Sequence, residues 1–303
     1  MVTTSVAEGH AITKTYGQRT VLSSVDFTVG TGVTGLVGSN GAGKTTLMSL
    51  LLGLRPRNGG NLSVLGVDPA TAGPEVRQRL GYAPEHHHLP PDVSAADLVR
   101  HLALLHGLPR RAATERANDT LWLVGLGEER FRPIGTMSTG QRQRVKLAGA
   151  IAHSPAMALL DEPTDGLDPV QRDDMLALVR RIGAEFDIAV LLSSHQLHEV
   201  ERICDAVIVL DGGRVVRSGA LADLQLSTGA LLVEVDDRGE DLARMLVERG
   251  CTVEPSGPGR LLVTGPDEAA DIIRDAVVEL HVGLRRLEAR RTSLDDLFLD
   301  TAP

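Results

Sequence analysis

Aromatic side chains are scarce in this chain of 303 residues, at 2% of the total. It therefore lacks the stacking platforms with which proteins bind single-stranded nucleic acid. The net charge is −9 and the basic residues are scattered, whereas a nucleic acid needs a basic face. From these shortages we expect no nucleic acid partner.

Cysteine and long apolar runs are scarce as well. Cys204 and Cys251 are far apart and match no metal-ligand spacing, so we expect two small buried thiols rather than a disulfide. No window holds 18 consecutive apolar residues, and residues 1–9 do not resemble a signal peptide. We expect a cytoplasmic protein that reaches the membrane only through a partner.

A glycine-rich loop at residues 38–45 is the clearest motif, since it fits G-x-x-x-x-G-K-[ST] at every fixed position. A short apolar run precedes it and helical spacing follows it, as in phosphate-binding loops. Lys44 is one of only three lysines, so its presence here by chance is improbable. We expect Lys44 to contact the β- and γ-phosphates and Thr45 to bind Mg²⁺. The predicted nucleotide-binding residues of this loop are Gly38, Ser39, Asn40, Gly41, Ala42, Gly43, Lys44, Thr45 and Thr46.

An apolar run over residues 157–160 ends in two carboxylates, Asp161 and Glu162. Its lack of alternation predicts a strand buried on both faces, and ligands bind at the carboxyl ends of such strands. Asp161 is predicted to hold Mg²⁺, and Glu162 to orient or deprotonate the attacking water. Alone, the pair could simply begin a loop; the phosphate-binding loop favours the functional interpretation.

A second anion site is predicted where Ser138, Thr139, Gly140 and Gln141 precede a helical stretch. Serine and glycine at a helix N-terminus offer a hydroxyl and free amides, although the same letters also form an ordinary helix cap. Because one chain needs only one phosphate-binding loop, we interpret this second site as serving a nucleotide held by another subunit.

Strand-like and helical segments alternate over most of the chain, which predicts an α/β fold with a mostly parallel sheet. Residues 94–126 are expected to be helical throughout. Near residue 222 the pattern changes to β-α-β-β-α-β, which is compatible with a small ferredoxin-like α+β domain. We therefore expect a nucleotide-binding domain over 1–222, with a helical subdomain at about 86–153, and an accessory or regulatory domain over 223–303.

These motifs make the chain resemble the ATP-binding subunit of an ABC transporter. Residues 38–45 match the Walker A loop, 138–141 the family signature, and 159–162 the Walker B strand with its catalytic glutamate. The resemblance covers about residues 6–220. It implies a P-loop NTPase core that carries an antiparallel β subdomain and a helical subdomain.

Three further residues match the family in order. The resemblance implies that Tyr16 stacks on adenine, that Asp168 of the D-loop lies at the nucleotide, and that His195 is the switch histidine that holds the γ-phosphate. Read without the family, Tyr16 could pack on an edge strand, and a histidine after a buried strand is more often structural.

Two positions depart from the family pattern. Thr139 replaces a glycine of the signature, but Ser138 and Gly140 are kept. Glu85 stands where a glutamine is usual; its carboxylate can still approach Mg²⁺ or the attacking water, with added negative charge. The three histidines that follow, 86–88, have no companion ligands and are interpreted as a solvated loop that faces the membrane partner.

The resemblance implies an ATPase subunit of a bacterial exporter, with ATP and Mg²⁺ as cofactors. It would form a homodimer, or pair with a paralogous ATPase subunit, and couple closure of that dimer to separate permease subunits at the inner face of the membrane. Residues 290–299 are similar to the tails of subunits that serve drug, polysaccharide and lipid exporters. Two alternatives stay open: a soluble ABC-type ATPase acting on DNA or ribosomes, and a regulatory protein whose residues 225–303 sense a ligand. The transported substrate does not follow from the sequence.

Overall fold

The computed structural model describes residues 5–86, 89–226, 230–266 and 268–289. It divides into two compact units, Met1–Ala220 and Leu221–Pro303. Both cysteines are buried free thiols, and burial raises the pKa of Cys204 to about 12. Among the described residues, no helix has the length and apolarity needed to cross a bilayer.

The first unit begins with a three-stranded antiparallel sheet of order β2-β1-β4. A tight turn at Gly17 (φ +58°) joins the first two strands. In β2, Leu22, Val25, Phe27 and Val29 are buried, and they pack in the main hydrophobic core of the unit. The strands are β1 (Ala7–Tyr16), β2 (Arg19–Val29) and β4 (Gly59–Val64).

A six-stranded sheet of order β5-β6-β7-β3-β8-β9 forms the centre of this unit. Strands β5, β6, β7, β3 and β8 run parallel, and β9 is antiparallel to β8. Every residue of β3, β6 and β7 is buried, which confirms the parallel α/β core predicted from their unbroken apolar runs. The strands are β3 (Val33–Val37), β5 (Leu80–Ala83), β6 (Met157–Asp161), β7 (Ala189–Ser194), β8 (Ala206–Asp211) and β9 (Arg214–Ala220).

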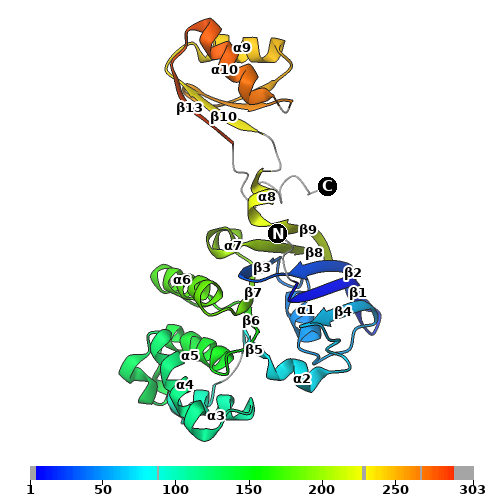
Figure 1. Ribbon diagram of the computed structural model, residues 1–303, viewed down its shortest axis with the longest axis vertical. Coiled ribbons are helices and arrows are strands. Elements are labelled where there is room, and N and C mark those ends of the chain that lie inside the picture. The colour runs from blue at the N-terminus through cyan, green and yellow to red at the C-terminus, as the bar shows by residue number, and fades with distance from the viewer. Residues whose placement is uncertain (1–4, 87–88, 227–229, 267, 290–303) are drawn as a thin grey trace. The chain divides into compact units, whose positions relative to one another are not determined.

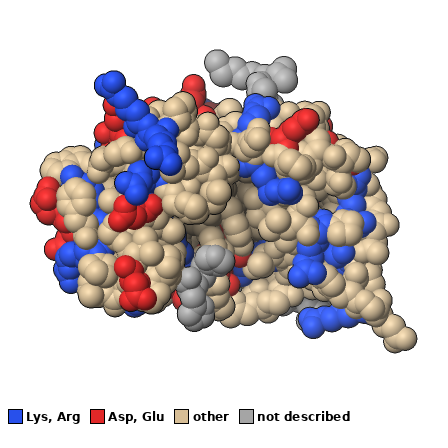
Figure 2. Space-filling view, turned by 90° about the horizontal axis from the view of Figure 1, so that it is seen from below, with Lys and Arg blue, Asp and Glu red and all other residues tan. Residues whose placement is uncertain are grey.

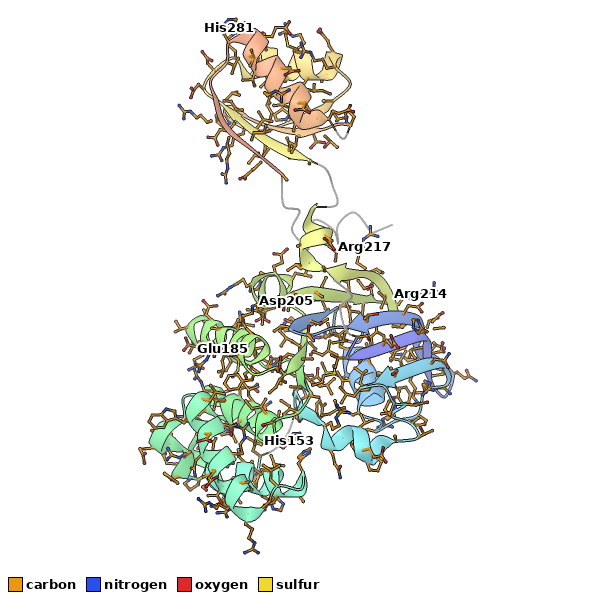
Figure 3. The ribbon with its side chains drawn as sticks, viewed as in Figure 1. His153, Glu185, Asp205, Arg214, Arg217 and His281 are labelled. Atoms are coloured by element: carbon orange, nitrogen blue, oxygen red, sulfur yellow. The ribbon has the colours of Figure 1, made fainter. Side chains whose placement is uncertain are left out.

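In the described part of the first unit, four helices accompany the two sheets. Asp205, labelled in Figure 3, ties one of them to the central sheet: its carboxylate accepts hydrogen bonds from Val33 N at 2.9 Å and from Arg180 Nη1 at 2.6 Å. The start of β3 is thereby linked to a helix from a distant part of the sequence. The helices are α1 (Lys44–Leu51), α2 (Gly73–Gln78), α6 (Pro169–Glu185) and α7 (Leu197–Ile203).

A helical subdomain lies at one end of this unit, away from the antiparallel strands (Figure 1). It consists of α3 (Ala95–Leu105), α4 (Arg110–Leu123), α5 (Thr139–Ile151) and two 3₁₀ turns, Gly127–Phe131 and Ile134–Thr136. The prediction of one helical stretch over 94–126 is wrong in its middle. Gly107 adopts a left-handed φ of +91° and Pro109 follows it, so the first helix ends and a second begins.

The second unit contains the predicted β-α-β-β-α-β order. Its antiparallel sheet has the order β11-β12-β10-β13, so the first strand of the unit lies between the third and the fourth, as in ferredoxin-like folds. Buried side chains such as Val233, Leu246 and Ile273 give the unit a core of its own. Its elements are α8 (Leu221–Leu226), β10 (Leu231–Val235), α9 (Gly239–Glu248), β11 (Thr252–Gly257), β12 (Arg260–Thr264), α10 (Ala269–Leu280) and β13 (Leu284–Ala289).

Charges of both signs are mixed on the face that Figure 2 shows. The Lys and Arg side chains of the described residues there form several separate groups, and Asp and Glu side chains lie among some of them.

Candidate nucleotide-binding site

The glycine-rich loop connects β3 to α1, and its backbone depends on glycine. Gly41 and Gly43 have φ values of +86° and +111°, which other residues rarely adopt. A Cβ atom at Gly38 would lie 2.4 Å from the carbonyl oxygen of Leu210, so this position has no room for a side chain. Within the described chain, no side chain caps the N-terminus of α1, and its first N–H groups are available to an anion.

A cavity of about 400 Å³ lies over this loop, within the size range of small-molecule sites. It brings the loop together with acidic residues that are distant in the sequence. Arg19 and Val21, which were not among the predicted site residues, also line it. The lining residues are Arg19, Val21, Ser39, Asn40, Gly41, Gly43, Lys44, Thr45, Thr46, Glu85, Asp161 and Glu162.

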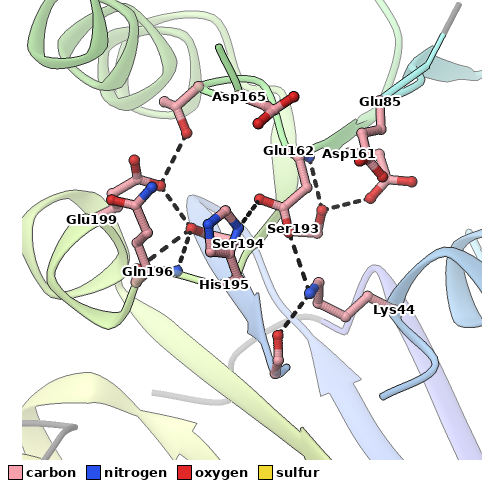
Figure 4. Close-up of polar contacts among 12 residues, drawn as sticks. Lys44, Glu85, Asp161, Glu162, Asp165, Ser193, Ser194, His195, Gln196 and Glu199 are labelled. Atoms are coloured by element: carbon pink, nitrogen blue, oxygen red, sulfur yellow. Dashed lines mark hydrogen bonds and ion pairs between the residues drawn. The ribbon is translucent and has the colours of Figure 1, made fainter. Parts of the chain in front are cut away.

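Glu162 occupies the space between Lys44 and His195 (Figure 4). Its Oε1 atom lies 3.2 Å from Lys44 Nζ, and its Oε2 atom lies 2.9 Å from His195 Nδ1. Lys44 Nζ also donates a hydrogen bond of 2.7 Å to the carbonyl of Gly38. Glu162 has a left-handed φ of +46°, a strained conformation that persists only where the surroundings enforce it.

Asp161 lies beside the loop and is fixed by two hydroxyl groups. Its Oδ2 atom accepts a hydrogen bond from Thr45 Oγ1 at 3.0 Å, and its Oδ1 atom accepts one from Ser193 Oγ at 2.6 Å. Ser193 in turn accepts from the backbone N–H of Glu162 at 2.9 Å. Ser193 was not among the predicted site residues; only its place directly before Ser194 and His195 could have indicated it.

Negative charge gathers at this end of the sheet and affects neighbouring groups. Burial raises the pKa of Tyr82 to about 12, and the charges of Asp161 and Glu85 add to the shift. Burial lowers the pKa of Lys146, whose ammonium group donates hydrogen bonds to the carbonyls of Pro84 and Glu85 at 2.9 and 3.0 Å. An excess of carboxylate near a phosphate site needs a cation for balance, and oxygen ligands suit Mg²⁺.

The predicted second anion site is not part of this cavity. Ser138 and Gln141 form a capping box at the start of α5, with Ser138 Oγ accepting from Gln141 N at 3.2 Å and Gln141 Oε1 accepting from Ser138 N at 3.0 Å. Ser138 and Thr139 are exposed, whereas Gly140 is buried against Gln171 of α6. Within one chain, therefore, this edge faces solvent and not the phosphate-binding loop.

Other predicted residues also lie outside the described lining of the cavity: Gly38 and Ala42 of the loop, His195, which contacts Glu162, and both Asp168 and Tyr16. Asp168 caps α6, since its Oδ1 atom accepts a hydrogen bond from Gln171 N at 2.8 Å. The ring of Tyr16 is 38% exposed, with Lys14 Nζ 4.8 Å from its centroid. Tyr16 is paired in register with Arg19, which does line the cavity. The ring is thus near the rim, and stacking on adenine stays a prediction.

The histidine run can be placed only in part. His86 Nε2 lies 3.1 Å from Glu85 Oε1, while residues 87 and 88 fall outside the described residues. Among the described residues, no group of three or more His, Cys, Asp or Glu side chains is suited to hold a metal ion by itself. A metal in the cavity would therefore need hydroxyl or phosphate oxygens beside the carboxylates.

The sequence resembles proteins of one kind over almost its whole length. Residues 22–165 match the ABC transporter family. The chain is 30% identical to the linearmycin resistance ATP-binding protein LnrL of Bacillus subtilis, over 95% of this chain and 96% of that one. It is also 30% identical to the daunorubicin/doxorubicin resistance ATP-binding protein DrrA of Streptomyces peucetius, over 98% and 92% of the two chains.

Solved structures show the same fold. A structure of an ATP-binding subunit of an ABC transporter superimposes with a TM-score of 0.66 at 29% identity, over 74% of this chain and 93% of that one. The ATP-binding cassette MJ0796, in a dimeric post-hydrolysis state bound to ADP and phosphate, gives a TM-score of 0.62 at 22% identity, over 71% and 98%. At that identity the second likeness concerns the fold alone.

Proposed function

Because this chain belongs to the ABC transporter family, we propose that the cavity over its glycine-rich loop binds ATP and that Glu162 directs the hydrolysis. The chain is an ATP-binding and ATP-hydrolysing subunit of an ABC transporter. The observation that carries the proposed residue roles is the position of Glu162, whose carboxylate contacts both Lys44 and His195.

The phosphates of ATP would replace part of this network. The glycine-rich loop and the N-terminus of α1 would bind the β- and γ-phosphates through backbone N–H groups, and Lys44 would pair with them. Once Lys44 contacts phosphate instead of Glu162, the Oε1 atom of Glu162 is free to accept a proton from a water molecule. His195 would then contact the γ-phosphate from the same side as Glu162.

The residues present fit a magnesium ion. Thr45 Oγ1 and Asp161 Oδ2 lie 3.0 Å apart at the mouth of the loop, and Glu85 lines the same cavity. These are hard oxygen donors of the kind Mg²⁺ prefers. When bound, the ion would supply charge neutralisation at the phosphates, which favours transfer of the γ-phosphoryl group. Asp161 and Thr45 would hold it, and Ser193 would keep the Asp161 carboxylate in place.

A second subunit would complete each site. Ser138 and Thr139 are exposed in the single chain, at the capping box that begins the helix behind them. We infer that this edge binds the γ-phosphate of ATP held by a second copy, or by a paralogous subunit, in a dimer with two-fold symmetry. Closure of that dimer would exclude bulk water.

Export is the transport direction we propose for the whole complex. LnrL and DrrA are named for drug resistance, and a 32% identical relative of Cupriavidus pinatubonensis is named as the Nod factor export ATP-binding protein I. By analogy, this chain would lie at the inner face of the membrane, bound to separate permease subunits. Residues 223–303 would form an accessory or regulatory domain of the same subunit.

Substitution of Lys44 tests the site. Lys44→Ala should abolish ATP binding and turnover, because it removes the cation that faces the phosphates. Arg111→Ala is the matched control, since that basic side chain is 92% exposed on α4. ATP binding by calorimetry and phosphate release would be measured for both. Normal turnover in Lys44→Ala would show that the cavity is not the catalytic site.

A further inference from the structure

A second carboxylate, outside the cavity, joins the segments that carry the catalytic groups. Glu199 lies on α7 and is 1% exposed. Its Oε2 atom accepts hydrogen bonds from Ser194 Oγ at 2.6 Å and from Thr164 Oγ1 at 3.0 Å. Its Oε1 atom lies 3.3 Å from Arg172 Nε. No sequence motif singled out this residue, and it lies outside the described lining of the ATP cavity.

The network continues from Glu199 to the loop that carries His195 and to the D-loop. Gln196 N donates to Ser194 Oγ at 3.0 Å, and Gln196 Oε1 accepts from Arg172 Nη1 at 3.2 Å. Arg172 Nη2 also donates to the carbonyl of Leu167 at 3.4 Å. Figure 4 shows Glu199, Ser194 and Gln196 grouped beside His195. Three chain segments therefore meet at one buried carboxylate.

The positions of these contacts along the chain matter for catalysis. Ser194 directly precedes His195, and Thr164 lies two residues after Glu162. Glu162 has the strained left-handed backbone, which its surroundings must hold in place. A carboxylate that binds both Ser194 and Thr164 fixes the two flanking segments relative to each other. It thereby acts on the 2.9 Å contact between His195 and Glu162.

We propose that Glu199 is a positioning residue for ATP hydrolysis: through Ser194 and Thr164 it keeps His195 and Glu162 in contact with each other. This inference rests on the proposed function, because it assumes that Glu162 and His195 act on the γ-phosphate. Arg172 is 27% exposed and Glu199 is 1% exposed, and an ion pair of this kind often contributes little net stability. The pair is therefore better explained by the positions that it gives to the two loops than by added stability.

Glu199→Gln tests the inference with little change in size. The amide keeps an acceptor for the hydroxyls but loses the charge that holds Arg172. We expect kcat for ATP to fall about 10- to 100-fold, as for a small misplacement of reacting groups, with KM changed less than about twofold. Glu185→Gln is the matched control, because it breaks an exposed ion pair with Arg181 on α6. It should leave both constants unchanged.

A purely structural role is separated by the double variant Glu199→Gln/Arg172→Gln. Removal of both charges leaves no half-buried cation without its ion-pair partner, so the melting temperature should recover toward that of the wild type. The kcat should stay as low as in Glu199→Gln, because the double variant does not restore the positions of the segments that contain Ser194 and Thr164. Recovery of kcat together with the melting temperature would overturn the proposal.

A double-mutant cycle that combines Glu199→Gln with His195→Ala tests whether Glu199 acts through that histidine. If it does, Glu199→Gln should reduce kcat less than about threefold when His195 is already absent. Independent, multiplying losses in kcat would overturn the proposal, as would wild-type kcat in Glu199→Gln. If the wild-type protein itself fails to hydrolyse ATP, the proposed function is wrong; if it hydrolyses ATP and Glu199→Gln does so equally well, only the inference is wrong.

Discussion

Replacement of Glu162 by glutamine separates ATP binding from hydrolysis. The Glu162 carboxylate lies 3.2 Å from Lys44 Nζ, and both side chains are 7% exposed. With an effective dielectric constant of about 20, the Coulomb attraction is on the order of 5 kcal/mol, from 332/(20 × 3.2). The cost of removing two charges from water offsets most of this attraction, so we expect the Lys44–Glu162 ion pair to be favoured over the separated side chains by about 1.4 kcal/mol.

This ion pair opposes ATP binding, because Lys44 must leave Glu162 before it can pair with a phosphate. Glu162→Gln removes the competing charge, and the dissociation constant for ATP should fall about tenfold. The same change removes the group proposed to accept a proton from water, and kcat should fall about 10²- to 10⁴-fold. The variant should therefore bind ATP more tightly and turn it over far more slowly.

Calorimetry and phosphate release on the same preparation would measure both effects. Glu128→Gln is a suitable control, because that carboxylate is 85% exposed and lies in a 3₁₀ turn of the helical subdomain. A kcat within about threefold of the wild type would refute the role of Glu162. Weaker ATP binding by the variant would refute the competition for Lys44.

Two further predictions concern the metal and the pH dependence of stability. Asp161→Asn should raise the Mg²⁺ concentration needed for half-maximal turnover about tenfold or more, because the carboxylate beside Thr45 loses its charge; an unchanged Mg²⁺ titration would contradict this. Burial, together with the neighbouring His106 and Arg116, lowers the pKa of His153 to about 4. Between about pH 6.5 and 4, the unfolded chain therefore binds a proton at this residue that the folded chain does not. The free energy of unfolding falls as the pH falls through this window. His153→Gln should reduce the difference in melting temperature between about pH 7 and 4.5, and an equal difference in both proteins would refute the assignment.

The elements that carry the proposed catalytic residues could be predicted from sequence because their signals are local. The glycines and Lys44 of the phosphate-binding loop occur within eight consecutive residues. The apolar run before Asp161 needs no partner to be interpreted as a buried strand. The signal for the break in the helical stretch was also local, because Gly107 and Pro109 lie at the break. The prediction of an unbroken helical stretch was wrong because it gave the apolar spacing more weight than these two helix-breaking residues.

Long-range contacts could not be predicted in the same way. The ion pair of Glu162 with Lys44 joins residues that are distant in the sequence, and it depends on the order of strands in the sheet. Ser193 meets Asp161 only because β7 pairs in parallel with β6. Glu199 is hidden for a similar reason, since a glutamate in a short helix looks like a surface residue until the hydroxyls around it are placed.

The central claim is that two chains share each ATP, with Lys44 from one and Ser138 from the other. The most direct test is the mass of Glu162→Gln in solution, by light scattering, with and without Mg·ATP. We expect a monomer without ATP, twice that mass with it, and a return to the monomer when Ser138→Arg is added. A monomer that holds ATP at full occupancy in Glu162→Gln would contradict the shared site.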